Sequence, residues 1–157
     1  MRQTAEIART LATGTHPGQL RVAWHPAAHH IAHITDEFGQ PVFLLEDASA
    51  LSSALHSDTE DDVAAVLHIN AREHRTQLWI SGWVSPLRGA DERKAADTYA
   101  QKYPVGELLD LGRGSTLYRI EVAEVRLGRG NTHYDIDIDE YYAASGREQD
   151  AWPLRAY

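Results

Sequence analysis

Four of the nine histidines in this 157-residue chain fall in one short stretch, HPAAHHIAH, as His25, His29, His30 and His33. Imidazole nitrogens bind zinc and haem iron, and they titrate near neutral pH, so this stretch could support metal, cofactor or pH-dependent chemistry. The backbone decides between these uses. On a helix, His29 and His33 would lie one turn apart and could share a zinc ion. On a strand they would point the same way but lie about 13 Å apart, too far for one ion.

Three serines and two tryptophans are further candidates for binding a cofactor. Ser49, Ser52 and Ser53 lie near the start of an expected helix. Hydroxyls there can bind a phosphate or simply cap the helix. Trp79 and Trp83 share one face of an expected strand, where they could stack on a flavin or porphyrin ring or fill a core or a subunit interface. The sequence holds neither a GxSxG elbow nor a Walker loop, so neither of these motifs suggests a catalytic residue.

Composition and charge exclude several classes of protein. The chain has no cysteine, which removes disulfides, thiolate ligands and cysteine nucleophiles. Its net charge is −8 at pH 7, and it has no Lys or Arg between Arg21 and Arg72, so we expect no nucleic-acid partner. The first residues lack the apolar run of a signal peptide, and no stretch approaches the roughly 20 apolar residues of a membrane span. We therefore expect a cytoplasmic protein with no membrane partner.

The hydrophobic periodicity predicts short strands with a few helices between them. Ile7 and Leu11 at helical spacing predict a helix over 5–13, ended by Gly14. A second helix is expected around 48–56, with Asp47 as its cap, and a third around 90–103, stopped by Pro104. Asp137 and Glu140 have the spacing of a capping box and predict a last helix from 137 to 145. An acidic loop, DTEDD, lies at 58–62, and strands are expected at 18–24, 29–35, 42–46, 63–69, 77–87 and 115–127.

This order of elements predicts a mainly β protein with antiparallel pairing, because each parallel strand would need a crossover helix. We expect one domain over 1–157, with a helix and lead-in at 1–17 and a helix and tail at 137–157. The strands suggest a small barrel that is closed or nearly closed.

Several stretches resemble the FMN-binding split β-barrel superfamily, the pyridoxamine-phosphate-oxidase-like group, and its haem-utilisation branch most of all. They are GQLRVAW, HHIAHITDEFGQPVFLLEDASALSSAL, QLWISGWVSPL and PVGELLDLGRGSTLYRIEVAEVRL. The resemblance implies a six-stranded antiparallel split β-barrel and a homodimer with ligand pockets in the groove between subunits. It also places HHIAHIT on the second barrel strand. His29 and His33 then cannot chelate one zinc, and we expect no metal site apart from a haem iron ligand among the four histidines.

The resemblance also bears on the cofactor. Flavin-binding relatives usually hold the FMN phosphate with Arg or Lys and hydroxyl groups, whereas the matching stretch 42–57 offers serines but no cation. A cation such as Arg72 or Arg88 could come from elsewhere. We therefore expect a cofactor-binding protein of the flavin or haem type that leans to haem binding or haem-linked redox chemistry. The expected cofactor-binding residues are His29, His30, His33, Ser49, Ser52, Ser53, Trp79 and Trp83.

Two alternatives stay open: an FMN-dependent oxidoreductase, and a cofactor-free binding or regulatory module. Whether the protein is an enzyme is open as well. Relatives in the haem branch often continue into a further helical domain, whereas this chain ends soon after its last expected helix.

Overall fold

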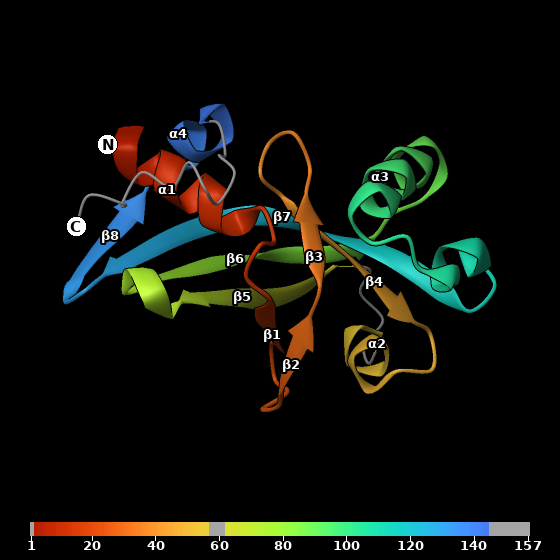
Figure 1. Ribbon diagram of the computed structural model, residues 1–157. Coiled ribbons are helices and arrows are strands. Elements are labelled where there is room, and N and C mark those ends of the chain that lie inside the picture. Colours follow the sequence, from red (N-terminus) through yellow and green to blue (C-terminus); the bar gives the residue numbers. More distant parts are fainter. Residues whose placement is uncertain (1, 57–61, 145–157) are drawn as a thin grey trace.

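The computed structural model of the chain describes residues 2–56 and 62–144. Its strands form one curled antiparallel sheet in the order β2-β1-β5-β6-β7-β4-β3, with β8 paired to β7 (Figure 1). The predicted mainly β barrel class is confirmed. The eight strands are β1 (Gly18–Val22), β2 (Ala28–Ile31), β3 (His33–Thr35), β4 (Pro41–Glu46), β5 (Val63–Ala71), β6 (Thr76–Pro86), β7 (Ser115–Arg129) and β8 (Thr132–Ile136).

The expected count of six strands is wrong for two local reasons. Ala32 interrupts the histidine-rich strand and divides it into β2 and β3. The residues after GRGN form β8, which pairs with β7 from Val125↔Ile136 to Arg129↔Thr132. Gly130 has a φ of 58° in the two-residue turn between them, a conformation that glycine adopts without strain. Gly130 and Asn131 of GRGN therefore form a hairpin turn, and the last strand, β8, follows it.

The helices follow their predicted positions closely. They are α1 (Arg2–Ala12), α2 (Ala50–Leu55), α3 (Gly89–Lys102) and α4 (Ile138–Ala143), with 3-10 turns η1 (Arg72–His74) and η2 (Gly106–Asp110). The cap of α2 is Ser49, whose side chain accepts from the Ser52 amide; Asp47 instead accepts from the Thr116 hydroxyl at 2.7 Å. Asp137 caps α4 by accepting from the Glu140 amide, as the capping box predicts. Residues 58–61 of the acidic loop and Ser145 lie outside the described residues.

The inward face of the sheet forms the main core together with α1. Leu20, Leu67, Leu78 and Ile80 are fully buried there, and α1 adds Ile7. These strand residues alternate with more exposed ones, because successive side chains point to opposite faces. The strand period predicted from sequence is therefore the one that builds the core.

A second, smaller core lies on the outward face of the sheet, at the end that α3 covers. Tyr99 of α3 packs there with Ile34, Val42 and Leu117. Figure 1 shows α3 at one end of the sheet, well apart from α1 and α4. The rest of the outward face, along β1, β5, β6 and the second half of β7, carries Trp79 and Trp83. Trp83 is 49% exposed, so it does not fill a core within one chain.

A β-bulge shapes this open part of the sheet. The β6–β7 register shifts between Ser81 and Gly82, where β7 has one extra residue. A side chain at Gly82 would collide with the Glu121 carbonyl, so the close approach of these strands requires glycine. Because of the bulge, both Ala123 and Glu124 line the outward face.

Arg9 joins three distant parts of the chain. Its guanidinium is almost fully buried and donates to the carbonyls of Tyr141 at 3.0 Å and Tyr142 at 3.1 Å in α4. It also donates to the Glu37 carbonyl, in the turn between β3 and β4, at 3.0 Å. Tyr141 in turn donates its hydroxyl to the Gly39 carbonyl of the same turn at 2.5 Å. This arrangement, the Arg9 clamp, fixes α1, the β3–β4 turn and α4 to one another.

Candidate functional site

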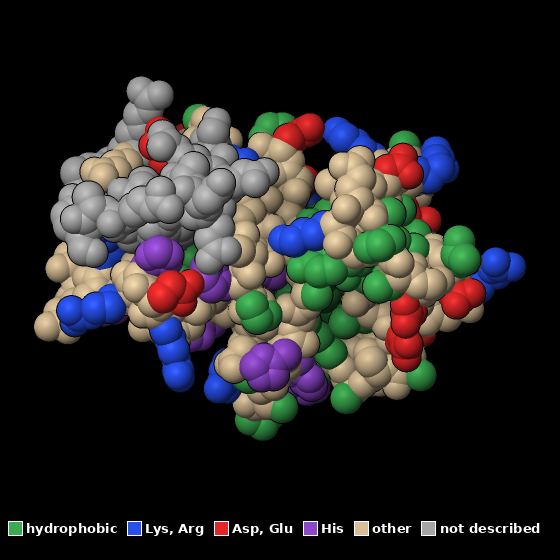
Figure 2. Space-filling view, in the orientation of Figure 1, with side chains coloured by type: hydrophobic (Ala, Val, Ile, Leu, Met, Phe, Trp, Pro, Cys, Tyr) green, Lys and Arg blue, Asp and Glu red, His purple; other side chains and the backbone are tan. Residues whose placement is uncertain are grey.

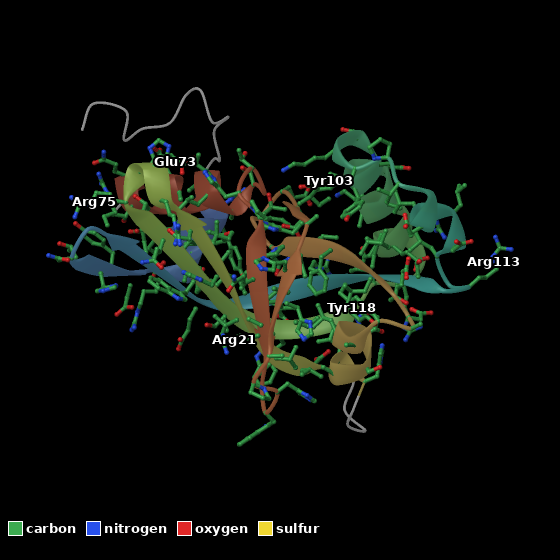
Figure 3. The ribbon with its side chains drawn as sticks, turned by 60° about the horizontal axis from the view of Figure 1, so that its bottom comes forward. Arg21, Glu73, Arg75, Tyr103, Arg113 and Tyr118 are labelled. Carbon is green, nitrogen blue, oxygen red and sulfur yellow. The ribbon has the colours of Figure 1, made fainter. Side chains whose placement is uncertain are left out.

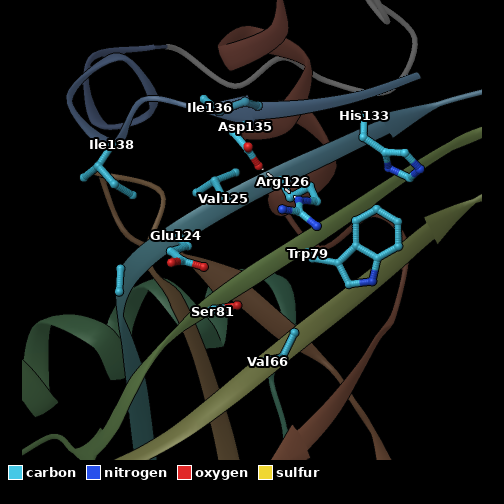
Figure 4. A pocket seen from close by; sticks show the side chains of 11 residues that line it. Val66, Trp79, Ser81, Glu124, Val125, Arg126, His133, Asp135, Ile136 and Ile138 are labelled. Atoms are coloured by element: carbon cyan, nitrogen blue, oxygen red, sulfur yellow. Dashed lines mark hydrogen bonds and ion pairs between the residues drawn. The ribbon is translucent and has the colours of Figure 1, made fainter.

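The open part of the outward face is hollowed by two adjoining depressions. The first has a volume of about 590 Å³ and lies over β6, β7 and β8 (Figure 4). The second, of about 390 Å³, includes Arg21, His25 and Trp83. Both include Val66, Ser81, Ala123 and Glu124, so they form one continuous depression, which we call the outer groove.

Trp79 forms the aromatic floor of the outer groove, between two histidines. The His68 ring stacks on it with centroids 5.2 Å apart and an interplanar angle of 18°. The His133 ring lies 6.0 Å from it on the other side, tilted by 46° (Figure 4). The strand register explains this row, because His68 is directly opposite Trp79, while His133 is opposite Gly128. A side chain at Gly128 would press on both Trp79 and His133, so the glycine makes room for their approach.

The two histidines differ in their hydrogen bonds. The Nε2 atom of His68 lies 2.7 Å from Oε1 of Gln77, and because the amide oxygen can only accept, Nε2 carries the proton. This leaves Nδ1 of His68 as a possible acceptor or metal ligand. His133 is exposed and forms no hydrogen bond or ion pair with the residues that the structure describes. Its imidazole is therefore available to a ligand.

Charged and apolar groups complete the first depression. Arg126 donates through Nε to Asp135 at 3.0 Å, and both side chains are largely exposed. Glu124 adds a second carboxylate, and apolar side chains line the remainder: Val66, Val125, Ile136 and Ile138. A flat apolar molecule could lie on Trp79 here, with an acidic group near Arg126 and an imidazole at its side.

The predicted histidine cluster is split between the two faces of the sheet. His30 is exposed, and histidine side chains show at the surface over β2 in Figure 2. It shares a cross-strand row on the outward face with Gln19 and His68, whereas His29 is opposite Leu20 and half-buried on the inward side. Within the described residues, no group of three or more His, Asp or Glu side chains is placed to hold a metal ion.

His33 is fully buried beneath the end of α1. Its Nε2 lies 3.1 Å from the Ala12 carbonyl, and its Nδ1 is buried without a hydrogen-bond partner. Burial lowers the pKa of His33 from its ordinary value of 6.5 to about 4; the bond to Ala12 opposes this shift and the charge of Lys102 adds to it. The ring is therefore neutral at physiological pH, and it donates Nε2–H to a carbonyl that the helix leaves free.

The three predicted serines lie together around α2, where their hydroxyls already have partners. Ser49 caps α2, and Ser53 donates to the Ser49 carbonyl at 3.3 Å. Ser52 is buried, with its hydroxyl 3.4 Å from that of Tyr118, which is also 2.6 Å from Nε2 of His56. Tyr118 lies among the strands beside α2 (Figure 3), and burial raises its pKa. The charge of Arg88 opposes this rise, as the smallest of the influences on Tyr118.

One chain therefore does not bring all the predicted site residues together. Trp79, Trp83, His25 and His30 lie on the outward face, whereas His29 and His33 face inward and the serines surround α2. Sequence reasoning missed His68, His133 and Arg126. His68 could have been predicted, because it takes an outward position in the alternation of VAAVLHI. His133 could not, because its strand, β8, was not predicted.

Comparisons with known proteins identify the fold. No protein-family model matches the sequence, and no curated protein matches it. Among solved structures, a haem-binding protein from Mycobacterium smegmatis is similar with a TM-score of 0.70 and 20% identity over 90% of this chain. The present chain spans 61% of the length of that protein.

The alignment with two further similar structures extends over nearly the whole length of those proteins. A protein related to general stress protein 26, of the pyridoxinephosphate oxidase family, from Clostridium acetobutylicum gives a TM-score of 0.66 at 14% identity, over 90% of this chain and 99% of that one. A general stress FMN/FAD-binding protein from Xanthomonas citri gives 0.63 at 13% identity, over 84% and 92%. No helix in the described part of the chain is long and apolar enough to cross a membrane. The similarity and the antiparallel curled sheet together give this chain the split β-barrel fold of the pyridoxamine-phosphate-oxidase-like proteins.

Proposed function

We propose that this protein binds haem in the outer groove, as a homodimer in which a second copy closes that groove. The observation that carries the proposal is the row His68, Trp79 and His133, in which an aromatic floor lies between two imidazoles. The similarity to a haem-binding protein of M. smegmatis supports it.

The side chains of the outer groove fit the three chemical demands of a haem. The porphyrin needs an apolar surface, which Trp79, Val66 and Ile138 provide. The iron needs an imidazole, and His133 has both ring nitrogens free of hydrogen bonds to described residues. The propionates need a cation, and Arg126 lies at the rim of the same depression. When bound, the haem would supply redox chemistry, while this chain binds and orients it.

FMN fits less well, because its phosphate needs hydroxyls and a cation together. The hydroxyls of Ser49, Ser52 and Ser53 already have partners within the chain, and α2 is a single short helix. Arg88 acts on this group only through a small effect of its charge on Tyr118. The structural similarity to an FMN/FAD-binding protein from X. citri supports FMN as the second candidate cofactor.

The exposure of the outward face supports the proposed dimer. Trp83, which is 49% exposed on this face, is a large apolar side chain that water covers in one chain. A second copy over this face would bury this side chain. It could also bring residues from another region of the partner, such as the edge strand with His30, to the outer groove.

A hemin titration followed by absorption tests the proposal. We expect a saturable Soret change at one hemin per chain. His133→Ala should alter the Soret position and weaken binding about tenfold or more, as loss of a ligand does. His74→Ala, on the 3-10 turn η1 outside the groove, is the matched control and should bind as the wild type. His25→Ala, His29→Ala and His30→Ala test the other predicted iron ligands.

The possible outcomes separate the hypotheses. No saturable response to hemin in the wild type would exclude haem binding, whereas a wild-type spectrum for His133→Ala would move the iron ligand elsewhere. Quenching of FMN fluorescence that Arg88→Gln abolishes would favour an FMN-dependent oxidoreductase. A chain that responds to neither hemin nor FMN would be the cofactor-free binding module.

A further inference from the structure

A second cleft, of about 500 Å³, lies between the β3–β4 turn and the first half of α3. Its lining residues are all different from those of the outer groove, and it lies at the opposite end of β7. Ile34, Val42 and Ala95 give it an apolar floor that continues the second core. The β3–β4 turn forms one wall of the cleft and α3 forms the other. The two lie beside each other in Figure 1.

The side chains of the turn wall are already occupied. The Asp36 carboxylate accepts from the amides of Phe38 and Gln40 and from the Gln40 side chain, each at 2.9 Å. Glu37 pairs with Lys94 of α3 at 3.3 Å across the mouth of the cleft. The Arg9 clamp holds the Glu37 carbonyl from behind. The Asp36 carboxylate therefore has partners within the turn, and Lys94 has a counter-charge.

Arg119 is a cation of this cleft without a partner among the described residues, and Asp91 is an acid of the cleft without one. Arg119 is half-buried on β7, directly opposite Val42 on β4 and Ser85 on β6. It makes no ion pair or hydrogen bond within residues 2–56 and 62–144. A half-buried guanidinium with five unused donors is well suited to a planar carboxylate, which it can bind through two parallel hydrogen bonds.

We propose that this cleft binds a small monocarboxylic acid with an apolar body, anchored by its carboxylate on Arg119. The apolar body would lie on Ile34, Val42 and Ala95. A phosphate is less suitable, because a dianion would be repelled by the acids around it: Asp36, Glu37 and Asp91. The proposal does not depend on haem binding, because it concerns different residues.

The test uses phenylacetate as the probe and phenylacetamide as its neutral counterpart, with binding followed by ¹H–¹⁵N NMR of the full chain. We expect saturable shifts at amides of the β3–β4 turn and α3 with phenylacetate, and none with the amide. Arg119→Gln should weaken binding about tenfold or more, and Arg119→Lys should restore part of it. Arg113→Gln removes an exposed cation outside the cleft, whose side chain bonds to the Leu109 carbonyl, and should leave the affinity unchanged.

Three results would overturn the proposal: no saturable shift with phenylacetate, unchanged binding in Arg119→Gln, or an equal loss in Arg113→Gln. Tighter binding of phenyl phosphate than of phenylacetate would overturn the choice of a monocarboxylate. The thermal midpoint of Arg119→Gln checks that the variant is folded. Its hemin titration should match the wild type, which separates a failure here from a failure of the proposed function.

Discussion

At the scale of single residues, His33 illustrates how burial turns a reactive side chain into a structural one. Its ring is enclosed between α1 and the sheet. Burial is the main cause that lowers its pKa from 6.5 to about 4. Between these two values the unfolded chain binds a proton at this residue and the folded chain does not. The free energy of unfolding therefore falls as the pH drops from 6.5 towards 4, by about 3 kcal/mol in total from this residue.

The pH dependence of stability tests this view of His33. We expect urea unfolding of the wild type to lose stability between pH 7 and pH 4 and His33→Phe to lose distinctly less over the same range. His133→Ala, which changes an exposed ring, should keep the wild-type slope. NMR titration of the His33 ring gives the same answer without a variant, and a midpoint near 6.5 would contradict the buried neutral state.

At the scale of elements, the Arg9 clamp holds the short helix α4 in place. An α4 of six residues is too short to be stable alone, so it depends on the carbonyls that Arg9 satisfies and on the buried ring of Tyr141. The guanidinium also lies over that ring, 5.5 Å from its centroid. Removing the guanidinium would take its donors away from the carbonyls of Tyr141 and Tyr142, which are buried and partly buried.

Arg9→Met should therefore destabilise the protein by about 3 kcal/mol and selectively free α4. We expect denaturant unfolding to shift and amide hydrogen exchange to rise most in α4 and in the β3–β4 turn. Arg113→Met is a suitable control, because Arg113 extends into solvent at the far end of the molecule and bonds only to the Leu109 carbonyl (Figure 3). Equal effects of the two substitutions would mean that the clamp has no special role.

The elements also show what the sequence can and cannot predict. Strands with one buried face were found from their alternation, since Leu20, Leu67 and Leu78 have to point inward. The sequence offers both Asp47 and Ser49 as caps of α2, because both residue types are good caps locally, and Ser49 is the cap in the structure. The Asp47 carboxylate accepts a hydrogen bond from the Thr116 hydroxyl instead. Thr116 lies 69 residues further along the chain and is brought to Asp47 by the β4–β7 pairing.

The candidate site was predicted only in part for a related reason. Trp79 was identified from its strand, but the partners that surround it come from β5 and β8. His68 and His133 meet Trp79 only through the register of three strand pairs, which a single sequence does not contain. His33 was chosen for its side chain, and its burial under α1 was not visible in the local pattern.

At the scale of the whole molecule, the proposed association of two copies would use the outward face. Its open end carries Trp83 next to the small residues Ala64 and Ala123, with Arg21 and Glu124 nearby. Such a surface can pair with itself, because each copy offers both charges and an apolar centre.

Trp83→Asp should therefore convert a dimer into a monomer, as measured by sedimentation velocity over a range of concentrations. Leu109→Asp changes an equally apolar side chain that is 80% exposed on η2, and it should remain dimeric. A wild-type chain that sediments as a monomer at all concentrations would exclude this association. Dimers that persist in Trp83→Asp would place the interface on another surface.

The link between Arg9 and Tyr141 spans 132 positions of the chain. On a ribosome, the first helix emerges long before the segment that it must hold. Until α4 leaves the exit tunnel, the arginine can meet only water or its own early neighbours. Closure of this part of the barrel is thus a late step of biosynthesis, and a nascent chain halted before residue 141 would lack it.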